Sequence, residues 1–196
     1  MTDIELDIAT AHSRMAKQWK NKKVKWSDLV KRCKEPTITN ETAAEYAKMT
    51  REEQSNIKDV GGFVGGYLSA GVRKSSNVMF RSCVTLDIDF GNSDVWEDFT
   101  LNYNFTALMY STHKHTDKSP RLRLVFPLSR RVTVGEYEPL CRKIASNIGM
   151  DIFDDTTYEF CRLFYWPSTP KDVKFVFEYQ DGPICDVDSI LLEYVD

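Results

Sequence analysis

Residues 84–90, VTLDIDF, have the composition of a buried β-strand but contain two aspartates, Asp87 and Asp89. Because side chains alternate across a strand, both carboxylates are expected on one face and the intervening apolar side chains on the other. Two neighbouring carboxylates repel each other and lose hydration unless a cation, a proton or water compensates them. The stretch therefore predicts a strand that carries a functional concentration of negative charge.

The 196-residue chain is long enough for one well-buried domain, and its hydrophobic content of 42% is that of a globular protein. It contains no apolar run that approaches a membrane span, and its first residues lack the layout of a signal peptide, so we expect a cytoplasmic protein without a membrane partner. The five cysteines are far apart and form no CxxC pair. This spacing argues against a zinc knuckle and against a disulfide framework.

The net charge of −3 does not indicate a nucleic-acid-binding protein. Residues 14–34, however, carry nine basic side chains and one acidic side chain, with Trp19 and Trp26 between them. Such a segment can follow a phosphate backbone and stack bases. A solvated amphipathic helix pair with both tryptophans in the core explains it equally well, and the segment alone leaves both interpretations open.

Residues 1–57 are expected to be helical. Apolar residues recur at helical spacing from Trp26, Asn40 can cap a second helix, and Thr50 with Glu53 forms a capping box for a third. We expect this helical part to belong to the same domain as the rest of the chain.

Residues 58–196 alternate strand-like and helical segments and are expected to form an α+β core. Five of the nine glycines lie within residues 61–71, where the backbone must turn sharply or approach another segment closely. The mixed order predicts a mainly antiparallel sheet. The expected strands are 78–90, 105–111, 121–128, 162–166 and 174–179, and the expected helices are 93–102 and 133–148, the latter starting at a capping box of Thr133 and Glu136.

The stretch YSTHKHTDKSPRLRLVFPL, residues 110–128, gathers side chains that can bind phosphate. Its candidate donors are Ser111, His113, His115, Lys118, Arg121 and Arg123. Together they can donate hydrogen bonds to the oxygens of a triphosphate, with arginine offering bidentate geometry. Considered alone, the stretch is explained more simply as a polar hairpin whose histidines face solvent and whose arginines pair with surface acids.

A group of three acids, Asp151, Asp154 and Asp155, precedes an aromatic segment that contains Arg162. Acids before a strand usually act as caps or turn residues. A third carboxylate delivered to the aspartate pair of residues 84–90 would instead complete an oxygen-rich site for Mg²⁺ or Mn²⁺. Carboxylates, a divalent metal and phosphate-binding cations together indicate phosphoryl transfer.

The order of LDID, STHKH and an acid before CRLFYWPS resembles the catalytic core of the archaeo-eukaryotic primase superfamily. The likeness is closest to the primase-polymerase domains at the N-terminus of phage and plasmid replication proteins, and it extends over about residues 19–170. It implies a sheet of RNA-recognition-motif type packed against a second α/β lobe, with the site in the cleft. It also implies a DNA replication enzyme that transfers nucleotides from NTP or dNTP to a 3′-hydroxyl under the direction of a template.

The resemblance assigns roles to individual residues. The DxD element falls on Asp87 and Asp89, which together with Asp154 would be catalytic and hold Mg²⁺ or Mn²⁺; Asp154 is favoured within its group for its distance from the arginine that follows. The Ser-x-His element falls on Ser111 and His113, which would contact the triphosphate. Further candidates are Arg123 and Arg162 as nucleotide or template contacts, and also His115, Arg121 and Asp155.

The implied partners are a single-stranded DNA template, NTP or dNTP, and a helicase. Relatives usually continue into a helicase of superfamily 3 or of virulence-associated-E type, whereas this chain stops at Asp196. We therefore expect either an excised domain or a separate helicase partner. If a phage or plasmid encodes the protein, its place is the cytoplasm of a bacterial host.

Two other functions stay open at this point. The HKH triplet resembles the paired-histidine metal site of rolling-circle nucleases, although Lys114 occupies the position where that motif has a hydrophobic residue. The second alternative is a nucleic-acid-binding replisome module without catalytic activity on the same fold. Because all three expected acids are present, the non-catalytic module ranks third, and the primase-polymerase function ranks first.

Overall fold

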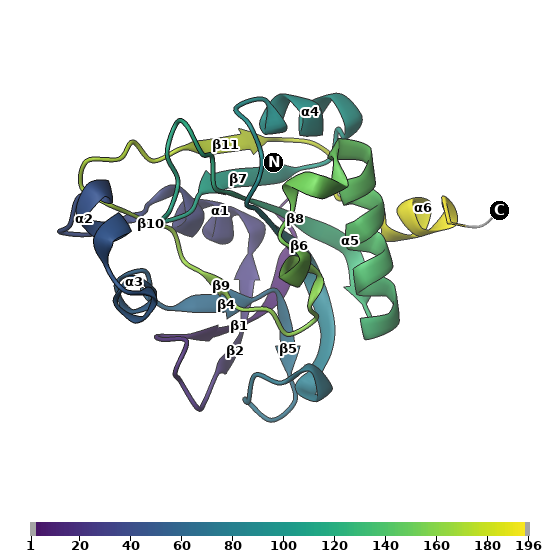
Figure 1. Ribbon diagram of the computed structural model, residues 1–196. Helices are drawn as coiled ribbons and strands as arrows, with labels where there is room; N and C mark the ends of the chain where they lie inside the picture. The colour runs from purple at the N-terminus through teal and green to yellow at the C-terminus, as the bar shows by residue number, and fades with distance from the viewer. Residues whose placement is uncertain (1–2, 195–196) are drawn as a thin grey trace.

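The computed structural model describes residues 3–194 as a mixed α+β fold whose centre is a five-stranded sheet (Figure 1). All four strand pairings in this sheet are antiparallel. In spatial order its strands are β11 (Phe177–Gln180), β7 (Ala107–Ser111), β8 (Leu122–Val132), β6 (Val78–Ile88) and β5 (Gly66–Leu68). The mainly antiparallel α+β fold expected from the sequence is confirmed.

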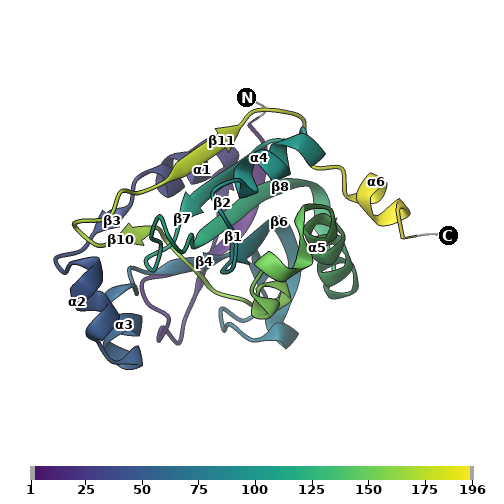
Figure 2. The ribbon, with the colours of Figure 1, turned by 45° about the horizontal axis from the view of Figure 1, so that its top comes forward.

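Helices α4 (Val95–Asn102) and α5 (Val134–Ile148) cover one face of the central sheet (Figure 2). Leu86 and Ile88 of β6 belong to the apolar cluster beneath them and are fully buried. The helix α5 begins at the expected capping box, in which Thr133 and Glu136 satisfy each other's backbone N–H groups. A further helix, α6 (Val187–Leu192), packs against α5.

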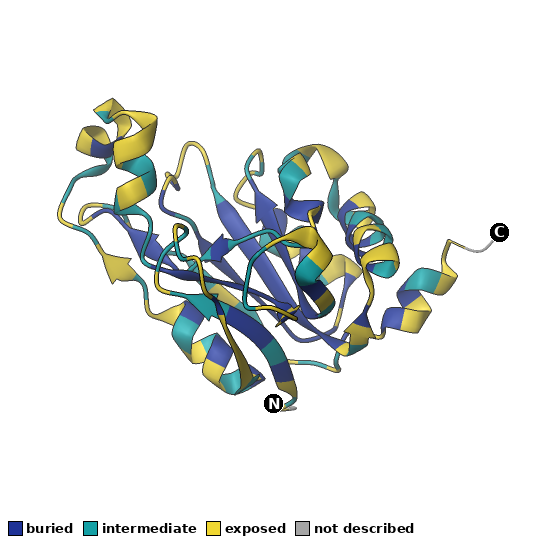
Figure 3. Cartoon of the chain, turned by 90° about the horizontal axis from the view of Figure 1, so that it is seen from below, coloured by how far each residue is buried: buried dark blue, intermediate teal, exposed yellow. Residues whose placement is uncertain are grey.

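The opposite face of the central sheet packs against a second sheet and helix α1 (Trp26–Lys34). The second sheet has the order β2 (Lys20–Lys25), β1 (Glu5–Ala11), β4 (Gly62–Val64) and β9 (Phe164–Tyr165), with every pairing antiparallel. In Figure 3 the central strands are dark blue and the outer faces of the helices are largely yellow, so the core lies along both faces of the central sheet.

The expectation of a helical N-terminal part is wrong. Helices α1, α2 (Ala43–Lys48) and α3 (Arg51–Ile57) are present, but β1, β2 and β3 (Thr37–Ile38) are strands. The strand β1 buries alternate side chains and pairs with β4 across the expected boundary at residue 57. Residues 1–2 of this expectation lie outside the described residues.

Of the two helix caps expected in the N-terminal part, one is confirmed and the other is wrong. The capping box of Thr50 and Glu53 starts α3 as expected. The cap of α2 is Thr42 rather than Asn40, because Thr42 forms a second capping box with Glu45. The short strand β3 pairs in parallel with β10 (Ser168–Thr169), which ties this part of the chain to the C-terminal half.

The glycine-rich segment combines both expected features. Gly61 and Gly71 have positive φ angles of 80° and 63°, which glycine adopts without strain. Gly66 lies so close to the Phe80 carbonyl oxygen of the neighbouring strand that a Cβ atom would collide with it. No helix among residues 3–194 is long and apolar enough to cross a membrane.

Candidate active site

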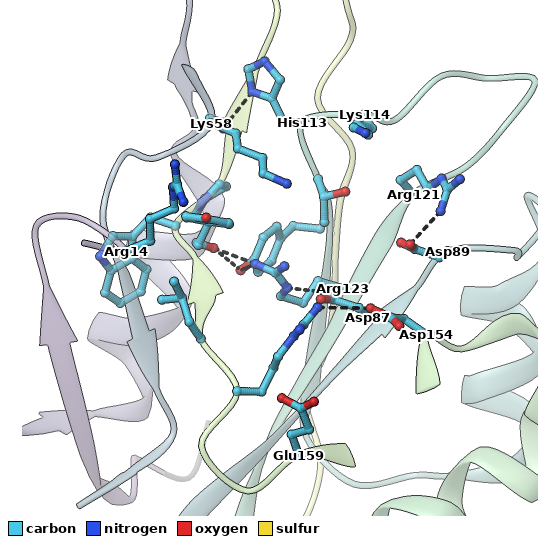
Figure 4. Close-up of a pocket in the computed structure, with 18 of the residues that line it drawn as sticks. Arg14, Lys58, Asp87, Asp89, His113, Lys114, Arg121, Arg123, Asp154 and Glu159 are labelled. Atoms are coloured by element: carbon cyan, nitrogen blue, oxygen red, sulfur yellow. Dashed lines mark hydrogen bonds and ion pairs between the residues drawn. The ribbon is translucent and has the colours of Figure 1, made fainter. Parts of the chain in front are cut away.

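A pocket of about 560 Å³ lies at the ends of β6, β7 and β8, and residues 154–168 form its other wall (Figure 4). Its lining is strongly charged. The acidic residues are Asp87, Asp89, Asp154 and Glu159, and the basic residues are Arg14, Lys58, Arg73, Lys114, Arg121, Arg123 and Arg162. All three acids expected at the metal site therefore line one pocket, together with three of the four residues expected to contact the nucleotide, namely His113, Arg123 and Arg162.

The register of the central sheet places Asp87 directly opposite Arg123. The Arg123 Nε atom lies 2.6 Å from Asp87 Oδ1, and the guanidinium also donates to Tyr110 Oη at 3.2 Å and to the Tyr165 carbonyl at 2.7 Å. Burial would lower the pKa of Arg123, but the adjacent Asp87 carboxylate outweighs it, so the pKa lies above its usual value. Asp87 and Arg123 thus form a buried ion pair.

Hydrogen bonds between backbone segments bring the third acid to the first two. The end of β6 and residues 152–157 are joined by the Asp89 N–H, which donates to the Ile152 carbonyl at 3.0 Å, and by the Asp154 N–H, which donates to the Asp87 carbonyl at 3.0 Å. The Asp87 N–H also donates to Thr157 Oγ1 at 2.7 Å. This short ladder fixes Asp154 beside the DxD element.

Asp89 and Asp154 also have arginine partners. Asp89 Oδ2 lies 2.7 Å from Arg121 Nη1, and Asp154 Oδ2 lies 3.1 Å from Arg162 Nη2. Both pairs are more exposed than the Asp87 pair. Each of the three acids is thus neutralised by one arginine, a feature that the individual motifs did not reveal.

The two other acids considered for the third position lie outside the pocket lining. Asp151 lies in the 3₁₀ turn Met150–Ile152, and Asp155 begins the 3₁₀ turn Asp155–Tyr158. Asp154 itself caps the second turn, because its carboxylate accepts hydrogen bonds from the N–H and Oγ1 of Thr156.

The Ser-x-His residues are held by protein groups. Ser111 is buried and outside the pocket lining, and its Oγ atom accepts a hydrogen bond from the Val176 N–H. His113 lines the pocket, but its Nδ1 lies 2.8 Å from Ser168 Oγ and its Nε2 lies 2.9 Å from Glu41 Oε1. Burial lowers the pKa of His113, so the ring is neutral at pH 7.

His115 has a different environment from His113. It lies outside the pocket lining, and its Nδ1 accepts a hydrogen bond from the Arg121 N–H at 3.2 Å. Burial lowers its pKa. The two histidines therefore do not meet at one site, and nothing in their contacts favours a paired-histidine nuclease centre.

Two lysines that sequence analysis did not single out as site residues, Lys58 and Lys114, line the pocket without an acidic partner anywhere in the described part of the chain. The Lys58 side chain points into the pocket, with its ammonium 5.4 Å from the Tyr165 ring centroid (Figure 4). Burial and the nearby charge of Lys114 lower the pKa of Lys58. Lys58 lies in the EYAKMTREEQSNIKDVGGFVGG stretch covered by the resemblance, and this was the only available signal for it.

The complete chain, residues 1–196, matches the family model described as the VapE N-terminal domain. The protein belongs to the VapE N-terminal domain family. This membership confirms the recognition from the three motifs. Among solved structures, the chain is similar to the AEP domain of the cyanophage S-2L primase-polymerase (PrimPol), with 12% identity and a TM-score of 0.49 over 95% of this chain and 87% of that chain. A search of curated proteins found no match.

The pocket of this VapE N-terminal domain contains carboxylates that could be ligands of a divalent metal ion. Within residues 3–194, no three His, Cys, Asp or Glu side chains are arranged to hold a metal ion. Asp87, Asp89 and Asp154 each face an arginine instead. Asp87 Oδ2 and Asp89 Oδ1 nevertheless accept no hydrogen bond from any of residues 3–194. Carboxylate oxygens are the hard ligands that Mg²⁺ and Mn²⁺ prefer, so the residues fit such an ion chemically.

Proposed function

We propose that this protein is the catalytic domain of a primase-polymerase, which transfers nucleotides from NTP or dNTP to a 3′-hydroxyl on a single-stranded DNA template. The observation that carries the proposal is that Asp87, Asp89 and Asp154 share one pocket with a surplus of cationic side chains. Acids that hold a metal and cations that hold phosphates are the two components that nucleotidyl transfer requires.

In this proposal Asp87, Asp89 and Asp154 hold Mg²⁺ or Mn²⁺. When bound, such an ion supplies charge neutralisation at the phosphates and lowers the pKa of the attacking hydroxyl. The acids would determine the position of the ion, because Asp87 and Asp89 lie at the end of strand β6, where backbone hydrogen bonds join it to residues 152–154. Arg121 and Arg162, which are the more exposed arginine partners, are free to turn towards a triphosphate.

We assign the main phosphate contacts to Lys58 and Lys114 rather than to Ser111 and His113. Within the described part of the chain these two ammonium groups have no carboxylate partner, so they repel each other, and a polyanion between them relieves this repulsion. The neutral His113 ring instead joins Glu41 to the β10 segment and so positions one wall of the pocket.

Primer extension with single-stranded template, labelled nucleotides and Mg²⁺ or Mn²⁺ tests the proposal. We expect template-dependent products from the wild-type protein. Asp89→Asn and Asp154→Asn should each lower the rate by at least about a hundredfold, because a lost metal ligand costs more than a lost supporting contact. Asp155→Asn is the matched control beside Asp154 and should keep most of the activity, since Asp155 lies outside the pocket lining.

Three results would contradict this function. They are an absence of template-dependent products from the wild type with either metal, near-normal activity of the Asp89 and Asp154 variants, and a covalent adduct between a tyrosine and DNA. DNA binding without any metal-dependent turnover would instead support the non-catalytic replisome module.

A further inference from the structure

A second groove, of about 490 Å³, lies between β2 and α1. The strand β2 is the exposed edge of the second sheet, and α1 follows it directly in the chain. Seven of the twelve residues that line the groove belong to the basic segment of residues 14–34, for which the sequence left two interpretations open. Trp19 and Trp26 are both buried, so the tryptophans of that segment belong to the core, but its lysines do not.

The lysines of β2 differ between the two faces of the strand. Lys23 lies 2.6 Å from Glu5 and Lys25 lies 3.6 Å from Asp3, so the lysines on one face have acidic partners. Lys20 and Lys22 are on the other face, line the groove and have no ion-pair partner within residues 3–194. The groove thus collects the uncompensated half of the charge of the strand.

An aromatic platform completes the groove. The Trp166 ring stacks on Phe63 with 4.8 Å between centroids, and the Arg32 guanidinium lies 5.0 Å from the Trp166 centroid. Asp28 is the single acid among the residues that line the groove. Trp166 also lines the candidate active site, so it forms part of the wall that both cavities share.

We propose that this groove binds single-stranded nucleic acid, with phosphates at Lys20, Lys22 and Arg32 and a base stacked at Trp166, and that it leads the strand to the candidate active site. That the strand is led to the candidate active site rests on the proposed function, whereas binding of the strand in the groove does not. Side chains two residues apart on a strand are separated by roughly 7 Å, which lets the two lysines contact neighbouring phosphates. Cations along a groove together with an aromatic ring are the combination that binds unpaired strands independently of sequence.

Charge alone would also attract an acidic protein segment, but the aromatic platform favours nucleic acid. Phe63 and the Arg32 guanidinium both lie against the Trp166 ring, so a base stacks there by displacing Arg32, which then contacts a phosphate. Base–aromatic stacking contributes substantially to binding of single strands. A duplex keeps its bases stacked on each other and gains nothing from the ring. The arrangement therefore predicts a preference for single strands over a duplex of the same sequence.

The test compares two double variants of the same strand. Lys20→Ala/Lys22→Ala removes the groove lysines, and Lys23→Ala/Lys25→Ala removes the same charge from the opposite face. Binding of a labelled oligodeoxynucleotide of about 15 nucleotides, close to the upper site size of known single-strand grooves, is measured by fluorescence anisotropy in EDTA without nucleotide. The salt concentration is varied, because released counterions report the number of phosphate contacts.

We expect the groove variant to bind at least about tenfold more weakly, with the slope of log K against log salt reduced by about 1.4, or about 0.7 for each lost contact to a single strand. The opposite-face variant should stay within about twofold of the wild type, since its lysines touch acids rather than phosphates. Trp166→Ala should weaken single-strand binding by about fivefold or more and leave duplex binding unchanged.

The proposal is overturned if the groove variant binds as tightly as the wild type, if both double variants lose the same affinity, or if duplex binds as tightly as the single strand. Primer extension by the wild type is measured separately with the same oligonucleotide. Normal extension with unaltered binding by the groove variant refutes the groove alone. If the groove variant binds more weakly but the wild type incorporates no nucleotide, the groove is supported and the proposed function is refuted.

Discussion

Asp87 and Asp89 are two residues apart in the sequence but have different environments. The Asp87 side chain is 11% exposed and pairs with Arg123, whereas the Asp89 side chain is 38% exposed and pairs with Arg121. The sequence alone predicts that removing either acid leaves the fold intact or even stabilises it by relieving repulsion. The buried ion pair predicts the opposite for Asp87, because its loss leaves the Arg123 charge without a partner.

This difference gives a prediction for the two arginines. Arg123→Gln should lower the free energy of unfolding by about 3 kcal/mol, because it leaves a buried carboxylate uncompensated. Arg121→Gln, in the more exposed pair, should lower it by less than about 1 kcal/mol. Urea denaturation followed by circular dichroism measures both values. Equal losses in the two variants would show that burial does not distinguish the pairs.

The site could be predicted where its residues lie in a motif. Asp87, Asp89 and Asp154 were all named from sequence and line one pocket. Lys58 was missed, because it comes from a separate segment and meets the acids only after β4 and β9 pair. Trp166 lies in the CRLFYWPS motif but was not singled out, because the motif alone does not show which of its aromatic side chains reaches the pocket. Their catalytic and binding roles, like those of the acids, stay predictions.

At the level of elements, apolar composition decided what the sequence could predict. The central strands β6, β7 and β8 are buried on both faces and were found as continuous apolar runs. The edge strand β2, KNKKVK, has no buried residue, so no apolar period marks it as a strand. Its conformation comes from pairing with β1, and this is a tertiary effect that the local sequence does not contain.

The close approach of β5 to β6 gives a prediction for a single glycine. Gly66→Ala should destabilise the protein by about 2 kcal/mol, because its Cβ would collide with the Phe80 carbonyl, which is backbone and cannot turn away. The control is Gly135→Ala in the first turn of α5, where nothing lies within 4 Å of the new atom. This change should be neutral or stabilise by up to about 1 kcal/mol.

Thermal and urea unfolding of the two glycine variants are measured side by side. Equal stability of Gly66→Ala and the wild type would mean that β5 shifts freely away from β6. The edge of the central sheet would then be less tightly packed than the contact at Gly66 indicates.

At the level of the whole molecule, net charge conceals how charge is distributed. The chain carries a net charge of −3. The candidate active site nevertheless collects seven basic residues and four acidic residues, because strands and loops from distant parts of the sequence converge there. A composition-based argument therefore did not indicate a polyanion, whereas the assembled pocket does.

The last prediction concerns binding of a nucleoside triphosphate to this pocket. At a concentration tenfold above its dissociation constant, a triphosphate in EDTA should stabilise the wild type by about 1.4 kcal/mol and raise Tm by roughly 3–6 °C. Lys58→Gln/Lys114→Gln should lose most of this rise at the same concentration. Lys17→Gln/Lys74→Gln removes equal charge from exposed positions outside the pocket lining and should keep it.

The stability of the ligand-free variants separates a binding role from a structural one. Because Lys58 and Lys114 repel each other and have no acidic partner among the residues that the structure describes, their removal should leave the ligand-free Tm unchanged or higher. A lower ligand-free Tm would mean that the lysines support the fold. An undiminished rise in Tm with triphosphate in the pocket variant would assign the phosphate contact to the arginines that line the pocket, three of which pair with the acids.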